Sequence, residues 1–367
     1  MNSRATSDHA ARIYKALIVL LVVLVSVPVY FSDYRAAAFN IAPRDDYAPY
    51  LLALTGETGD GPRRQAELMP GAPMAHRPLS VAVAVPFYYV LPYYAFTNIE
   101  APDEPYLRAT AALTFVGWIC MLMTALVVYA LARRRCGCTS GASLTAALAA
   151  LLLFNFFDLA GIDALALFLV AILVYYIDRP AVVVPTVLLA AVTNEKVVII
   201  ALVLYAGRLL AALMQRRPRA AYAYWPQLAA SALAFVGYVV FRTVIAPRPG
   251  YGSQLDPTTW IGTAIDTASL SLSLKGAMTN GVPLAAMAVL LVIAYRAAPG
   301  LAATTASFRR VDILVALALL TTAAFIGAEF TVGRLVLHAF PLYVPLFAVV
   351  VDNYLCFRRS EASAGAA

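Results

Sequence analysis

Polar and charged residues interrupt two long hydrophobic runs, and their side chains are the best placed for chemistry. The first group, between residues 190 and 200, consists of Asn194, Glu195 and Lys196. The second group, between residues 327 and 341, consists of Glu329, Arg334 and His338. Ionisable groups inside an apolar segment are costly, so they mark either a functional site or internal ion pairs.

Both interpretations stay open for each group. Arg334 and His338 are four residues apart, so on a helix they would share one face and could reach one ligand. The alternative is a structural ion pair between Glu329 and Arg334. Glu195 and Lys196 could likewise bind a ligand or neutralise each other.

A pair of adjacent carboxylates follows the first hydrophobic run. Repulsion between Asp45 and Asp46 favours retention of a proton on one of them, and such a carboxyl can act as a general base toward a hydroxyl. Tyr47 and Tyr50 lie close behind and could contact a substrate. The competing interpretation is a solvated acidic turn, since perturbed groups mark sites only statistically.

Four more polar residues are candidates for substrate binding. His76 and Arg77 precede an apolar segment, and an arginine at headgroup level could hold a phosphate through two hydrogen bonds. Ordinary snorkelling of an interfacial arginine is the alternative. Asp158 and Asp163 fall in a short turn between two apolar runs.

The composition predicts an all-α polytopic membrane protein forming a single integral membrane domain. Of the 367 residues, 62% are hydrophobic and 13% charged, against about 45–50% and 25% in soluble domains. Long continuous apolar runs predict about ten transmembrane helices. The expected spans cover residues 13–31, 109–132, 141–157, 164–177, 180–193, 197–214, 226–245, 281–297, 311–328 and 334–351.

Arginine clusters set the expected orientation, because short cytoplasmic loops are rich in Lys and Arg. Residues 78–96 are rich in Pro and Tyr. If they form an interfacial helix instead of crossing the membrane, every such cluster falls on the cytoplasmic side. We therefore expect a bacterial inner (plasma) membrane protein with both termini cytoplasmic. Residues 32–108 form a large external loop, and residues 352–367 form a cytoplasmic tail.

Two adjacent spans are unusually short. Residues 164–177 and 180–193 provide about 14 residues each, whereas roughly 20 are needed to cross a bilayer. Such segments thin the bilayer or carry their polar ends below its surface. We expect the second outcome, which would place polar groups in a cavity open to the outer leaflet.

The order of motifs resembles the GT-C superfamily of membrane glycosyltransferases, in particular the protein mannosyltransferase and aminoarabinose transferase branch. The matching stretches are Asp45-Asp46-Tyr47, His76-Arg77-Pro78-Leu79, Tyr129-Ala130-Leu131-Ala132-Arg133-Arg134 with Gly137, Thr193-Asn194-Glu195-Lys196, and Arg334 with Pro341. Two departures stand out. Asp46 replaces the commoner Glu, and Lys196 follows its Glu instead of preceding it.

This resemblance implies transfer of a sugar from a polyprenyl-phosphate carrier to an acceptor outside the membrane. It also implies that Asp45 or Asp46 deprotonates the acceptor, while Arg77, Lys196 and Arg334 hold the donor phosphate. The expected partners are the lipid-linked sugar, membrane lipid and an acceptor that is a glycan, lipid or protein.

Two other classes of function remain as alternatives. A transporter or flippase of a lipid-linked saccharide would use the same cations, although the paired repeats typical of transporters are missing from the sequence. A non-catalytic scaffold would not depend on Asp45 or Asp46. Nucleic-acid binding is not expected, because the basic residues lie between the expected transmembrane helices instead of forming one basic face. Cys136 and Cys138 lack a second pair at zinc spacing, so no metal site is expected and any cofactor is unknown.

The orientation predicts that a cysteine at position 101, now Ala101, reacts with a membrane-impermeant thiol reagent added outside intact cells. The reaction should need no permeabilisation, because residues 32–108 are external. The matched control is a cysteine at position 216, now Arg216, which should react only after permeabilisation. Reversal of the two results would contradict the orientation.

Overall fold

The structure, a computed structural model, is all-helical over the residues that it describes. These are residues 13, 15–31, 47–57, 78–92, 104–154, 163–214, 216, 218–241 and 337–354, together with isolated positions between 244 and 292. Seven predicted site residues lie outside the described residues, namely Asp45, Asp46, His76, Arg77, Asp158, Glu329 and Arg334. Most of residues 281–297 and all of residues 311–328 lie outside as well, so these two expected spans stay predictions.

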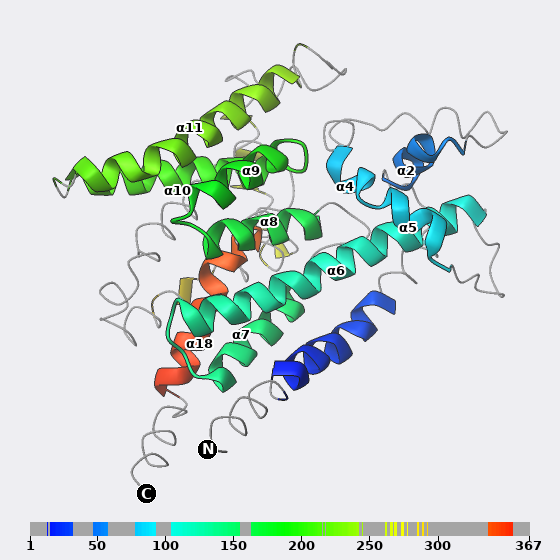
Figure 1. Cartoon of the computed structure of the whole chain (residues 1–367), viewed down its shortest axis with the longest axis horizontal. Helices are drawn as coiled ribbons and strands as arrows, with labels where there is room; N and C mark the ends of the chain where they lie inside the picture. The colour runs from blue at the N-terminus through cyan, green and yellow to red at the C-terminus, as the bar shows by residue number, and fades with distance from the viewer. Residues whose placement is uncertain are drawn as a thin grey trace, which may run out of the picture.

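All described helices except α2 (Ala48–Thr55) overlap an apolar segment expected from the sequence, and Figure 1 shows their arrangement. After an unlabelled helix at Lys15–Phe31, the described helices are α2, α4 (Pro78–Ala82), α5 (Val85–Val90), α6 (Glu104–Arg134), α7 (Ser140–Leu153), α8 (Asp163–Tyr175), α9 (Pro180–Ala191), α10 (Glu195–Met214), α11 (Pro218–Val240) and α18 (Phe340–Tyr354). Three of the described helices are long and apolar enough to cross a membrane: α6, α10 and the Ala221–Val240 part of α11.

Several boundaries differ from the sequence-based expectation, and proline accounts for three of them. The expected helix over residues 78–96 is two short helices, α4 and α5, and Pro86 lies in the first turn of α5. α11 already begins at Pro218 and keeps Pro226 in its interior. α18 begins only at Phe340, next to Pro341. Proline suits the first turn of a helix, because it lacks a backbone N–H and its fixed φ matches helical backbone.

One candidate site residue lies just before α18. His338 is in a turn two residues before that helix. Arg334 lies outside the described residues, so the shared helical face expected from the four-residue spacing stays a prediction.

Contacts between helix ends show that the C-terminal ends of α6, α8, α10 and α18 lie close together. Arg134 and Arg135, at the end of α6, donate to the hydroxyl and the carbonyl of Tyr175, at the end of α8, both at 3.0 Å. The Thr139 hydroxyl, in the turn after α6, donates to Asp352 near the end of α18 at 2.6 Å. Arg208, in the second half of α10, reaches Asp178 just beyond α8. All four helices therefore end at one end of the bundle, which we call the arginine end (Figure 1).

An ion pair between a buried arginine and a carboxylate that is 38% exposed holds the arginine end together. Arg208 is 1% exposed and donates to Asp178 at 2.8 Å, while Arg135 lies 3.7 Å from the other oxygen of that carboxylate. The Arg208 guanidinium also lies over the ring of Tyr224 on α11, 5.4 Å from its centroid. This cluster joins the turn after α6, the turn after α8, and helices α10 and α11.

Helices α2, α4 and α5 form a small layer against the first half of α6. α2 and α5 both contact α6, and the rings of Phe87 and Phe115 lie 5.2 Å apart. At the other edge of the layer, the Leu79 amide of α4 donates to the Val192 carbonyl in the turn after α9 at 3.1 Å. That turn leads directly into Asn194.

The arginine end allows a test of the packing. Replacing Asp178 with Asn removes the carboxylate charge beside the buried Arg208, and we expect a loss of about 1 kcal/mol of stability, because Asp178 is 38% exposed and water screens part of the interaction. The measurement is thermal unfolding in detergent. Glu104→Gln is the matched control, because Glu104 pairs with Arg108 on an exposed helix surface and such pairs contribute little. Equal losses in the two variants would contradict the description of the cluster.

Candidate functional site

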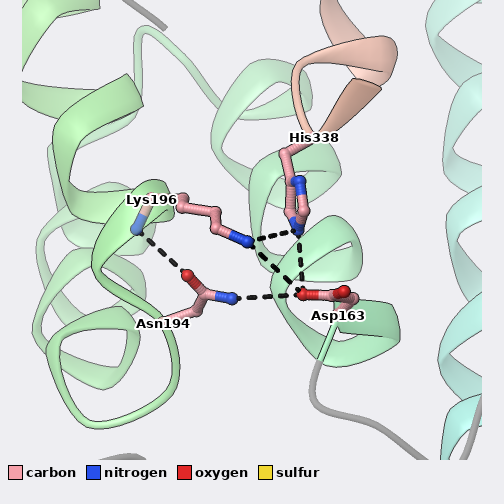
Figure 2. Close-up of polar contacts among 4 residues, drawn as sticks. All are labelled: Asp163, Asn194, Lys196 and His338. Atoms are coloured by element: carbon pink, nitrogen blue, oxygen red, sulfur yellow. Dashed lines mark hydrogen bonds and ion pairs between the residues drawn. The ribbon is translucent and has the colours of Figure 1, made fainter. Parts of the chain in front are cut away.

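Four residues proposed for substrate binding from the sequence meet at one point of the structure (Figure 2). They are Asp163, Asn194, Lys196 and His338. His338 Nε2 lies 2.9 Å from Asp163 Oδ1, although 175 residues separate the two in the chain. Lys196 Nζ lies 3.4 Å from His338 Nε2 and 3.8 Å from Asp163 Oδ1. Asn194 Nδ2 donates to the same Asp163 Oδ1 at 3.5 Å.

The beginnings of three helices position these side chains. Asp163 is the first residue of α8, and Lys196 is the second residue of α10. Asn194 caps α10, because its Oδ1 accepts from the Lys196 amide at 3.1 Å. His338 comes two residues before α18. Helix N-termini carry partial positive charge, so α8, α10 and α18 add to the positive potential of Lys196 at this point.

The four-residue cluster is largely buried. Asn194 is fully buried and the His338 side chain is 1% exposed, while the side chains of Asp163 and Lys196 are 10% and 19% exposed. Low exposure strengthens charge interactions, because less water screens them. Lys196 therefore needs an anion beside it, and the Asp163 carboxylate fills that role in this structure.

The position of a proton couples the three ionisable groups. If His338 Nε2 carries a proton, it donates to the Asp163 carboxylate; if it does not, it can accept from the Lys196 ammonium. One nitrogen cannot do both at once. The cluster can therefore change hydrogen-bonding partners with small side-chain movements, a property that suits a site that receives a charged ligand.

The cluster lies well inside the length of the bundle. Asp163 and Tyr175 are the two ends of α8, so at 1.5 Å per residue the cluster is about 18 Å from the arginine end. α6, with 31 residues, extends about 45 Å from the same end. α8 packs beside the C-terminal part of α6 (Figure 1), which puts the cluster near the middle of α6. α4 lies beside it through the contact between Leu79 and Val192.

The remaining described candidates lie elsewhere or at the edge of the cluster. Tyr47 and Tyr50 belong to the layer at α2, where Tyr47 is buried in the core and Tyr50 packs against it. Glu195 is half-buried at the first position of α10, next to the cluster in sequence. The other seven candidates lie outside the described residues, so the roles expected for Asp45, Asp46, Arg77 and Arg334 stay predictions.

The pairing of Asp163 with His338 is the feature that sequence reasoning missed. Both residues had been identified, but in separate groups, with His338 assigned to Arg334. One signal was available. Asp163 and His338 both lie near the outer end of an expected span, and so do Asn194 and Lys196. Pairing these ends would have required knowing that α8, α10 and α18 are neighbours.

No family model matches this chain, and neither a curated protein nor a solved structure shows significant similarity to it.

The Asn194 cap gives a direct test of the local geometry. Asn194→Ala removes both the cap of α10 and the contact with Asp163, so we expect a loss of about 1 kcal/mol or more. Asn194→Ser is the matched control, because serine also caps helices and should recover most of that loss. Thermal unfolding of both variants is the measurement. A serine variant as unstable as the alanine variant would show that the cap is not what Asn194 contributes.

Proposed function

We propose that this protein transfers a sugar from a polyprenyl-phosphate carrier to an acceptor on the outward side of a membrane. The observation that carries the proposal is the buried cluster of Asp163, Asn194, Lys196 and His338, about 18 Å from the arginine end. If the arginine end faces the cytoplasm, as the positive-inside rule requires, the cluster lies toward the outer side of the membrane.

Lys196 and His338 are suited to a phosphate leaving group. A lysine ammonium and a protonated imidazole are both hydrogen-bond donors, and hydrogen bonds from charged donors to phosphate are stronger than neutral ones. When the bond between sugar and phosphate breaks, negative charge grows on the phosphate oxygens. Donors fixed in a poorly screened site stabilise that charge in the transition state more than in the bound donor.

The surroundings fit a lipid carrier. Leu188, Leu189 and Val192 lie on and just after α9 with exposed fractions of 44%, 48% and 40%, and Val192 is two residues before Asn194. Exposed apolar side chains so close in sequence to a buried cationic cluster suit an isoprenoid chain with a phosphate at its head. Ser80, Thr110 and Thr114 have buried hydroxyls without a hydrogen-bond partner among the described residues, and they lie on α4 and the first part of α6. Such groups suit contact with sugar hydroxyls.

The acceptor must be deprotonated, and the proposal gives this role to Asp45 or Asp46. This assignment rests on the acidic motif in the sequence and on its resemblance to GT-C enzymes. The two carboxylates precede α2, whose layer packs against α6 and, through α4, lies next to the cluster. An acceptor arriving from outside could therefore meet a donor held at Lys196 and His338.

The test is sugar transfer from a polyprenyl-phosphate donor in detergent, with donor binding measured alongside. Asp45→Asn or Asp46→Asn should bind donor but lose transfer by about 10²–10⁴-fold, the usual effect of removing a positioned base. Lys196→Met should slow transfer by about 10²–10³-fold, since it removes a donor to the leaving group. The matched control is Lys15→Met, on the exposed surface of the first helix, which should transfer normally.

Other results would favour the alternative functions. Full transfer in both aspartate variants would end the assignment of the base. Wild-type protein that moves lipid-linked saccharide across liposomes but transfers no sugar would be a transporter or flippase. Convergence of helix N-termini on a buried charged site is also known in transporters, so this comparison is necessary.

A further inference from the structure

One oxygen atom of the cluster has an unusual set of neighbours. Asp163 Oδ1 lies 2.9 Å from His338 Nε2, 3.5 Å from Asn194 Nδ2 and 3.8 Å from Lys196 Nζ. Three nitrogen atoms from three different segments therefore surround a single carboxylate oxygen, as the dashed lines in Figure 2 show. This arrangement resembles the way proteins surround an oxygen of a bound anion.

The backbone favours an anion at the same place. α8 and α10 begin within the cluster and α18 begins two residues after His338, so three positive helix ends meet there. Helix N-termini bind phosphate groups in many proteins because their amide groups and dipoles favour negative charge. Two independent features, the side-chain donors and the helix ends, thus select for an oxyanion at the position of Asp163 Oδ1.

We propose that this position binds one oxygen of a phosphate ester and that Asp163 occupies it in the ligand-free protein. The proposal rests on the proposed function for the identity of the phosphate, which is the head of the polyprenyl carrier. Asp163 keeps Lys196 paired while no ligand is bound, and so lowers the cost of burying it. The arriving phosphate displaces the carboxylate and takes over its donors.

The exchange has a cost that can be measured. Two anions cannot share the three donors without repulsion, so the carboxylate must rotate away or take up a proton before the phosphate binds. Wild-type protein therefore binds phosphate more weakly than it would without the Asp163 charge. A residue that merely stabilised the site would have the opposite effect, because its loss would weaken binding.

The experiment measures binding of a polyprenyl phosphate without sugar, by isothermal titration calorimetry in detergent. Asp163→Asn keeps the shape of the side chain and removes its charge, so it should bind on the order of tenfold more tightly than wild type. Asp163→Ser should do the same and replaces the first variant if that variant does not fold. The double variant with Asp163→Asn and Lys196→Met should not show this increase in phosphate affinity.

Two controls make the result specific. Asp178→Asn removes another carboxylate paired with a buried cation, at the arginine end, and should leave phosphate affinity unchanged. Inorganic phosphate identifies the source of the ligand. An equal gain with inorganic phosphate would point to a free anion, whereas a gain with the lipid alone would point to the headgroup of a carrier.

Unchanged or weaker binding in both folded variants, Asp163→Asn and Asp163→Ser, would overturn the proposal. This result is separable from failure of the proposed function. If wild-type protein transfers no sugar but Asp163→Asn still binds phosphate more tightly, the anion position is right and the transferase assignment is wrong. If transfer occurs but the gain in affinity is absent, Asp163 does not hold the phosphate position.

Discussion

A lysine buried among apolar helices must have a counter-charge, and this requirement organises the described part of the protein. Lys196 is 19% exposed and has Asp163 and His338 within 3.8 Å. Bringing these groups together requires the beginnings of α8 and α10 to lie beside the turn that precedes α18. The parallel course of these helices follows from that meeting point as much as from the contacts at their other ends.

The opposite end of the bundle is built differently. There the Asp178 carboxylate pairs with Arg208 and Arg135, and Thr139 donates to Asp352. Two of these contacts tie a turn to a helix, and the contact between Arg135 and Asp178 joins two turns. With 13 and 12 residues, α8 and α9 are about 20 and 18 Å long, well short of the roughly 30 Å hydrocarbon core of a bilayer. A polar site at the far end of such short helices lies below the level reached by α6.

Much of this organisation could be predicted from the sequence, and the limits have physical causes. Hydrophobic runs located the described helices except α2, because continuous apolar stretches leave few alternatives. The polar interruption at Asn194 and Lys196 identified the beginning of α10. Boundaries near Pro86, Pro218 and Pro341 were less predictable, because a proline can begin a helix or prevent one depending on the residues around it. The pairing of Asp163 with His338 could not be predicted from the sequence with only the positions of these residues at span ends as a signal, since it depends on which helices are neighbours.

The central claim is that the beginnings of α8, α10 and α18 form one binding position for a phosphate. A structure of the protein with bound polyprenyl phosphate, determined by electron cryo-microscopy, tests this claim most directly. The account predicts phosphate density within hydrogen-bonding distance of Lys196 Nζ and His338 Nε2, with the Asp163 carboxylate moved away from both. Phosphate density at the arginine end, or an Asp163 still bonded to His338 beside a fully occupied lipid, would contradict it.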